Sequence, residues 1–173
     1  DIDLLPAHFQ RHGYHSIGLG KIAHNGEEDP RCWSEPHRMP KNGGYEYRTK
    51  AGRALVKDIQ RKAAEAGLPD PLRDIPEKIH RGMAWESLAV ADRETGDGQI
   101  ADMALAALER VQGKRFFLAA GFLRPHLPFV APQKYWDLYD PERLPTPESA
   151  APPPGSPPLI GNRSRELLRQ YQG

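Results

Sequence analysis

The sequence predicts an α/β fold for a chain of 173 residues, a length that corresponds to about one domain. Three observations support this class. Residues 3–20 have the pattern of a helix, a glycine and a short apolar strand. Residues 98–122 repeat the order of helix and then strand. The second apolar run, FFLAAGF, carries no charge, and uncharged strands that follow helices are typical of parallel sheets.

The first half of the chain contains two predicted helices and one predicted strand. Leucine and phenylalanine form a single stripe over 3–12, which predicts a helix, and the apolar alternation over 14–20 predicts a buried strand. Alanine, leucine and isoleucine recur at helical spacing over 51–66 and predict a second helix. We expect loop-rich insertions over 25–50 and 68–97, and long irregular segments of this kind are often functional.

The clearest helical pattern lies over 98–112, where isoleucine, methionine, alanine, leucine and valine share one face. Asp97 and Gly98 are expected to form a turn and the N-cap of this helix. The apolar run over 116–122 is expected to be a strand buried on both faces.

The last third of the chain is rich in proline, because eleven of the eighteen prolines follow residue 124. A short helix is predicted over 132–139, with a proline at its first position. The eight prolines of 141–158 predict an extended surface crossing, and a further helix is predicted over 164–172.

Charge and composition bound the class of partner. Lysine and arginine number 24 against 23 acidic residues, a net charge of +1, which gives no electrostatic reason to expect nucleic acid or an anionic membrane as a partner. No apolar run approaches the roughly 18 residues of a membrane helix. One cysteine, Cys32, rules out an internal disulfide and a multi-cysteine zinc site. The first residue is Asp rather than Met, so we expect either that processing removed the start or that this is a piece of a longer protein.

Two cation–imidazole pairs follow the two predicted buried strands. Lys21 and His24 follow the first strand, and Arg124 and His126 follow the second. In open α/β sheets, ligands bind beyond the carboxyl ends of the strands. Brought together, these side chains would form a pocket for a tetrahedral oxyanion, with cations on the oxygens and a histidine to protonate a departing alkoxide. The plainer interpretation is that each cation is a solvated cap at a strand end.

Two longer stretches carry a resemblance to a known family. The stretch LPAHFQRHGYHSIGLGKIAHNG resembles the segment of iduronate-2-sulfatase-like sulfatases in which a helix is followed by HGY and GKxxH. The stretch FFLAAGFLRPHLPFVAPQKYWDLYDPERLP is similar to that family's segment with the xPH motif, and DGQIADMALAALE precedes it in the same order. The resemblance covers nearly the whole chain and is weakest over roughly 25–95.

The resemblance implies a fold, a reaction and residue roles. The fold would be the α/β/α sandwich of the alkaline-phosphatase-like superfamily, and the reaction would be hydrolysis of a sulfate ester by a formylglycine, with calcium holding the sulfate. Lys21 would contact sulfate and formylglycine, and His24 would bind the formylglycine hydroxyl and help to eliminate sulfate. His126 would touch the sulfate and protonate the leaving alcohol. Arg124 stands where lysine is commonest in the family, so its charge is kept and its geometry differs.

The family's nucleophile motif, C/S-x-P-x-R, is expected ahead of GKxxH, and no match to it precedes Lys21. Cys32 lies in CWSEPH and is interpreted as an ordinary cysteine. The aspartate pair and the Asp-His or Asp-Asn pair of the calcium site are absent too, so no metal ligand is assigned here. We therefore expect residues 1–173 to be the central part of a sulfatase catalytic domain, truncated at both ends. Calcium and formylglycine would lie outside this chain, and the chain alone would be inactive.

Several alternatives remain open at this point. A phosphodiesterase or phosphonate hydrolase of the same superfamily would use the same residues, and a non-catalytic module would only bind a sulfated glycan. A stand-alone α/β domain is the plainest reading. The expected partners are a sulfated carbohydrate and the remaining segments of the parent domain, and the family implies a secreted, periplasmic or lysosomal location. The other candidate residues are assigned plain roles: surface histidines at His8, His12 and His15, solvated loop histidines at His37 and His80, and packing tryptophans at Trp33, Trp85 and Trp136.

Overall fold

A computed structural model describes residues 3–24, 29–41, 47–68, 82–146, 153–157 and 171–172. The chain divides into two compact units, which are described separately below. The first comprises Asp1–Glu46 and Val90–His126, and the second comprises Tyr47–Ala89 and Leu127–Gly173. Across the described ranges, no helix combines the length and apolar character that crossing a bilayer requires.

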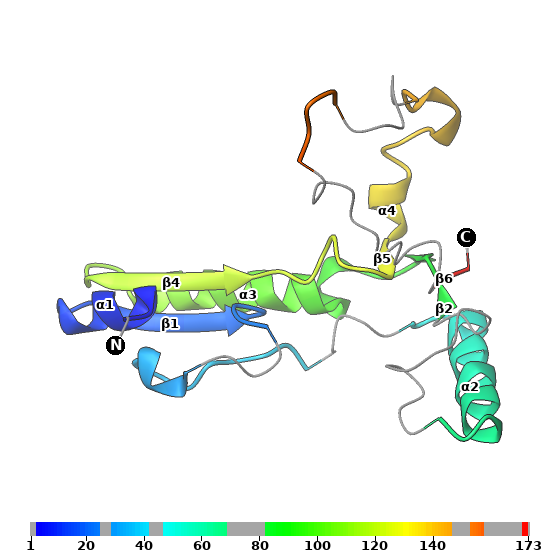
Figure 1. Cartoon of the computed structure of the whole chain (residues 1–173). Helices are drawn as coiled ribbons and strands as arrows, with labels where there is room; N and C mark the ends of the chain where they lie inside the picture. The colour runs from blue at the N-terminus through cyan, green and yellow to red at the C-terminus, as the bar shows by residue number, and fades with distance from the viewer. Residues whose placement is uncertain are drawn as a thin grey trace. The chain divides into compact units, whose positions relative to one another are not determined.

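The first unit is built on two parallel strands. Its elements in chain order are α1 (Leu5–Arg11), β1 (His15–Gly20), η1 (Pro30–Cys32), η2 (Asp92–Glu94), α3 (Gly96–Arg110) and β4 (Phe116–Gly121). The register of β1 and β4 runs from His15 opposite Phe116 to Gly20 opposite Gly121. Figure 1 shows α3 running alongside this pair of strands. The helices predicted over 3–12 and 98–112 and both predicted strands are therefore confirmed.

The core of the first unit lies between β1 and α3. Ile17 and Leu19 of β1 are fully buried, as is Ala107 of α3, and Val111 just after α3 is 1% exposed. Met103, Ala104 and Leu118 pack against this cluster. The apolar stripe predicted on the helix therefore packs against the sheet.

A third segment, residues 34–38 (the edge segment), lies along the edge of β1 that faces away from β4. The amide N–H of Ser34 donates to the carbonyl of Ser16 at 2.8 Å, and that of Gly20 donates to the carbonyl of Arg38 at 2.9 Å. Leu19 and Arg38 form a parallel bridge. Part of the predicted 25–50 insertion thus extends the sheet, because β1 bonds to this segment on one edge and to β4 on the other.

Two expectations for the first unit need correction. β4 is not buried on both faces: Phe116 is 37% exposed and Phe122, just beyond the strand, 51%. Within the described ranges, β4 pairs with β1 along one edge, and no named strand lies beside the other edge of β4. The α3 helix begins at Gly96 and its N-cap is Thr95, whose hydroxyl accepts a hydrogen bond from the Gly98 amide at 3.1 Å. Asp97 therefore lies in the first turn and is not the cap.

The second unit contains short parallel strands and a longer helix. Its elements are α2 (Lys50–Glu65), β2 (Gly82–Met83), β3 (Trp85–Leu88), β5 (Phe129–Pro132), α4 (Gln133–Trp136), η3 (Pro141–Arg143) and β6 (Tyr171–Gln172). β3 pairs with β5 and β2 pairs with β6, both in parallel. Every strand pair in the described ranges is parallel, which supports the predicted α/β class.

The second unit also corrects the sequence reading. The predicted 68–97 loop contains β2 and β3 in its described part, and β3 was missed because WESL has four residues and a central charge. Pro132 is the last residue of β5 and the N-cap of α4, so it is not the first helical residue. Residues 171–172 form a strand where a helix was expected, and the remainder of that predicted helix lies outside the described residues.

The charge in β3 has a structural role. Glu86 is 2% exposed, and its carboxylate accepts hydrogen bonds from the amides of Arg48 and Thr49 at 2.7 and 3.2 Å and from the Thr49 hydroxyl. Thr49 is the N-cap of α2. Because a buried carboxylate needs several donors to offset its lost hydration, this cluster ties β3 to the start of α2.

Candidate oxyanion site

The carboxyl end of β1 places a cation beside an imidazole. Lys21 follows Gly20 directly, and its amide N–H donates to the Gly121 carbonyl at 2.8 Å. The Lys21 Nζ lies 3.2 Å from Nδ1 of His24. Because an ammonium group only donates, Nδ1 of His24 accepts in this contact and the proton of the neutral ring is on Nε2. Lys21 is half-buried and His24 is exposed, so both reach solvent at the strand end.

The carboxyl end of β4 carries the second pair. Arg124 and His126 follow the strand in a tight turn, in which the His126 amide donates to the Leu123 carbonyl at 3.0 Å. The guanidinium Nη1 of Arg124 donates to the His126 carbonyl at 3.2 Å. Arg124 is half-buried and His126 is exposed. The turn therefore presents its imidazole outward.

The two strand ends meet because of two glycines. Gly20 and Gly121 are register partners at the last position of the β1–β4 pair. A Cβ atom at Gly121 would lie 1.8 Å from the Lys21 carbonyl oxygen, and one at Gly20 would lie 2.2 Å from the Gly121 carbonyl oxygen. Gly20 also has φ +71°, which side chains disfavour. The backbone at Lys21 therefore contacts the backbone that leads into the Arg124 turn, and no side chain fits between them.

A carboxylate that the sequence reading did not place at the site lies on α3. Asp97 Oδ1 accepts from the Leu123 amide at 2.7 Å, and its Oδ2 accepts from the Arg124 amide at 3.0 Å. Gly98 beside it is also required, because a Cβ there would lie 1.8 Å from the Asp92 carbonyl oxygen. An Asp-Gly pair before a helical pattern is also typical of a helix N-cap, which is why the sequence predicts that role. Only the tertiary contact with Leu123 and Arg124 distinguishes a cap from a residue that binds a neighbouring turn.

His37 is a second residue whose position differs from the expectation. It was expected to be a solvated loop residue, yet its Nε2 lies 2.7 Å from the Gly20 carbonyl oxygen and its ring is half-buried. The ring stacks on Trp33 with centroids 6.2 Å apart. Its imidazole therefore lies at the end of β1, beside Gly20, the residue that precedes Lys21. His80, the other loop histidine, lies outside the described residues.

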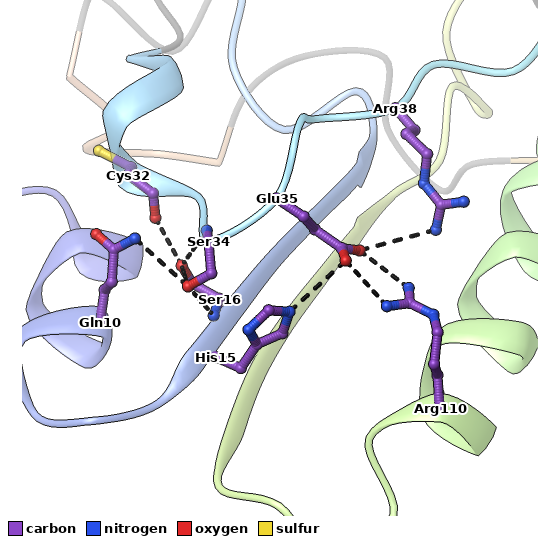
Figure 2. A network of polar contacts seen from close by, with 8 residues as sticks. All are labelled: Gln10, His15, Ser16, Cys32, Ser34, Glu35, Arg38 and Arg110. Atoms are coloured by element: carbon purple, nitrogen blue, oxygen red, sulfur yellow. Dashed lines mark hydrogen bonds and ion pairs between the residues drawn. The ribbon is translucent and has the colours of Figure 1, made fainter.

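An ionic network fixes the edge segment against the unit (Figure 2). The carboxylate of Glu35 accepts hydrogen bonds from Nη1 and Nη2 of Arg110, each at 2.9 Å. It also lies 3.6 Å from the His15 ring and 4.0 Å from the Arg38 guanidinium. The Arg110 guanidinium holds the pKa of Glu35 below its usual range, and Glu35 raises the pKa of Arg110. This bidentate pair links the edge segment to the last turn of α3.

Neutral hydrogen bonds complete that attachment. The Ser16 hydroxyl donates to the Cys32 carbonyl at 2.8 Å, and the Ser16 amide donates to the Ser34 hydroxyl at 3.0 Å (Figure 2). Cys32 is 4% exposed, which agrees with its interpretation as an ordinary cysteine. The edge segment that carries His37 is therefore held at both of its ends.

The tryptophans and surface histidines were assigned plain roles. Trp33 is buried, and its ring fills the space over Gly18, so the packing role is confirmed for it. Trp85 is 48% exposed and lies beside Trp136 with centroids 5.3 Å apart, so these two rings pack on each other outside the core. His8 and His12 are exposed as predicted. Within the part of the chain that the structure describes, no three side chains of histidine, cysteine, aspartate or glutamate gather as a metal site would require.

The residues at the two strand ends have the chemistry of a site for an anionic group. Two cations and two imidazoles follow the ends of adjacent parallel strands, and the carboxylate on α3 is already occupied by backbone amides. Such an edge suits an anionic group with several oxygens, because cations stabilise the charge and an imidazole transfers a proton. No family model matches the chain.

Curated proteins similar to this chain are sulfatases. A protein named Sulfatase from Formosa agariphila is 29% identical over 147 residues, which are 85% of this chain and 26% of that protein. Iduronate 2-sulfatase from Homo sapiens is 28% identical over 166 residues, which are 91% of this chain and 27% of that protein. The enzyme of the same name from Mus musculus is 27% identical over the same length. The chain spans about a quarter of these relatives, and the similarity confirms the predicted resemblance to the sulfatase family.

Proposed function

We propose that this chain is a central segment of the catalytic domain of a sulfatase with the alkaline-phosphatase-like α/β/α fold. The parent protein would hydrolyse a sulfate ester on a sugar. The observation that carries the proposal is the meeting of two strand ends at Gly20 and Gly121, each followed by a cation and a histidine. The similarity to proteins named as sulfatases supports the same reaction.

Each proposed role follows from the chemistry of the side chain. Lys21 and Arg124 bind sulfate oxygens, since both are cationic side chains that only donate hydrogen bonds. His126 donates a proton to the oxygen of the departing alcohol, because an alkoxide leaves poorly without one. Nδ1 of His24 accepts a hydrogen bond from Lys21, so Nε2 carries the ring proton and is the atom that would donate a hydrogen bond to the group holding the sulfate.

Calcium and a formylglycine are implied by the family, and the residues here do not fit either. No C/S-x-P-x-R motif precedes Lys21, where the family has it. Ser34 to Arg38 match the spacing, but they follow Lys21 and their Ser34 hydroxyl accepts from the Ser16 amide. The single cysteine is buried. Both oxygens of Asp97 already accept backbone amides, and the described residues gather no metal-ligating cluster. The nucleophile and the calcium ligands would come from other segments of the parent domain, and no step is assigned to them here.

A panel of esters with one leaving group tests the reaction class. The full-length parent protein is incubated with para-nitrophenyl sulfate, bis(para-nitrophenyl) phosphate and para-nitrophenyl phenylphosphonate, and with a set of monosaccharide sulfates. Since the leaving group is shared, differences among the nitrophenyl esters report the acid group alone. We expect release of sulfate from the sulfate esters and from at least one sugar sulfate.

Other outcomes identify the alternatives. Preferred turnover of the phosphate diester or the phosphonate ester would assign a phosphodiesterase or phosphonate hydrolase of the same superfamily. Retention on immobilised heparin without turnover of any ester would assign a non-catalytic module that binds sulfated glycans. The proposed partners are a sulfated carbohydrate and the remaining segments of the domain, with no nucleic acid or membrane, and the proposed location is secreted, periplasmic or lysosomal.

A further inference from the structure

Asp97 is connected to the proposed site through the backbone. Its two carboxylate oxygens accept the amides of two consecutive residues, Leu123 at 2.7 Å and Arg124 at 3.0 Å. A bidentate carboxylate on adjacent amides fixes both the position and the orientation of a turn, since two bonds remove a rotation that one bond allows. These charge-assisted bonds are about twice as strong as neutral ones.

The local role that the sequence suggests for Asp97 is already filled. Thr95 caps α3 through the Gly98 amide, and its own hydroxyl donates to the Asp92 carbonyl at 2.7 Å. The Asp97 side chain therefore leaves its own helix end and turns to the strand end. It binds there to the first two amides of the turn that carries His126.

We propose that Asp97 is a positioning residue that holds the Arg124–His126 turn so that the His126 imidazole faces the oxygen of the leaving alcohol. This role rests on the proposed function of the site. Asp97 does not touch the substrate. It acts through the Leu123 and Arg124 amides, and the His126 amide in turn donates to the Leu123 carbonyl at 3.0 Å. A change at Asp97 therefore reaches His126 through a chain of hydrogen bonds.

Asp97→Asn is the variant that isolates this contact. Asparagine has the same size and keeps one acceptor, but its NH₂ group faces one of the two amides as a second donor. Asp102→Asn on the exposed side of the same helix is the matched control, because it removes the same charge from α3 without touching the turn. Asp97→Glu keeps the charge and tests whether reach matters.

Two measurements on the full-length protein decide the proposal. Hydrogen exchange of the Leu123 and Arg124 amides should be at least about tenfold faster in Asp97→Asn and unchanged in Asp102→Asn, because the loss of an acceptor frees the amide. The turnover of a sugar sulfate should fall about 10–100-fold, since misplacement of a catalytic group by about 1 Å costs up to 10²-fold. Turnover of para-nitrophenyl sulfate should change less than about threefold, because that leaving group needs no proton.

The outcomes separate this inference from the proposed function. An equal loss on both esters would mean that Asp97 is merely structural and would overturn the proposal. Unchanged amide exchange in Asp97→Asn would overturn it as well, whatever the activity. If the wild-type protein hydrolyses neither ester, the proposed function fails, and the exchange result alone then decides whether Asp97 holds the turn. Partial recovery of sugar-sulfate turnover in Asp97→Glu would support the role.

Discussion

Gly20 and Gly121 lie opposite each other at the last register position of β1 and β4, and neither has room for a Cβ atom. The amide of the next residue, Lys21, donates to the Gly121 carbonyl at 2.8 Å. This contact joins the two strand ends that carry the proposed sulfate-binding side chains. The positions of these side chains therefore depend on a backbone contact between two glycines, which have no side chains.

Gly121→Ala should destabilise the protein more than an alanine at an open glycine. The new methyl group would overlap the Lys21 carbonyl oxygen, so the strand ends would have to separate, at a cost of at least about 3 kcal/mol. Gly113→Ala is the control, because φ there is +73° but no atom lies within 4 Å of the added Cβ, which predicts about 1–2 kcal/mol. Thermal unfolding of the full-length protein compares the two. Equal midpoints would show that the close approach is dispensable.

Lys21→Ala should lower sulfate-ester turnover by about 10²–10³-fold, since a preorganised donor to a developing oxyanion contributes that much. Lys114→Ala removes an exposed lysine at the other end of β4, and should leave turnover within about twofold. Steady-state kinetics of both variants with para-nitrophenyl sulfate provide the comparison. A similar loss in both variants would point to a general effect of charge and would remove Lys21 from the site.

Glu86→Ala should unfold the second unit more readily than a surface substitution. The change leaves the Arg48 and Thr49 amides without their acceptor at the start of α2, at a cost of about 2–4 kcal/mol. Glu65→Ala on α2 is the control, since its pair with Arg61 is exposed and contributes less than about 1 kcal/mol. Limited proteolysis within 47–68, mapped by mass spectrometry, measures the opening. Cleavage at the same rate in both variants would contradict the structural role of Glu86.

The Glu35–Arg110 pair predicts a dependence of stability on pH. The pKa of Glu35 is lower in the folded state than in the unfolded chain, so the pair stabilises the fold at pH values above the ordinary glutamate pKa of about 4.3. That contribution is lost as the pH falls through the lower, folded pKa. Because the pair is partly exposed, we expect less than about 1 kcal/mol.

Glu35→Gln isolates that contribution. Between about pH 6 and pH 3, the free energy of unfolding should fall more for the wild-type protein than for Glu35→Gln. Denaturant unfolding of both proteins, repeated at intervals of about one pH unit, measures this difference. Arg110→Gln should flatten the curve in the same way, since it removes the other partner. Parallel curves for wild type and both variants would exclude the pair as a source of pH dependence.

The sequence predicted those parts of the fold that are encoded by local periodicity. The helices over 3–12, 51–66 and 98–112 and the strands ending at Gly20 and near Gly121 have that pattern, and the structure contains them. β3 and the edge segment 34–38 lack it, because a four-residue strand and an irregular strand are defined by the partners beside them. The exposure of β4 likewise depends on the number of neighbouring strands, which no local pattern encodes.

The candidate site divides in the same way. Lys21, His24, Arg124 and His126 could be predicted because each lies in a short motif directly after an apolar run. Asp97 and His37 could not, since their side chains reach backbone groups about 20 residues or more away in the chain. A residue that binds a backbone amide or carbonyl leaves no sequence pattern at its partner.

A double-mutant cycle between Lys21 and His126 tests the central claim most directly, that the two strand ends form one sulfate site. The cycle uses kcat/KM of the full-length protein for a sugar sulfate in wild type, Lys21→Ala, His126→Ala and the double variant. Residues that act as a unit are strongly non-additive, so we expect the double variant to lose little more than the worse single variant. Loss in the double variant equal to the product of the two single losses, or no loss in either single variant, would contradict the account.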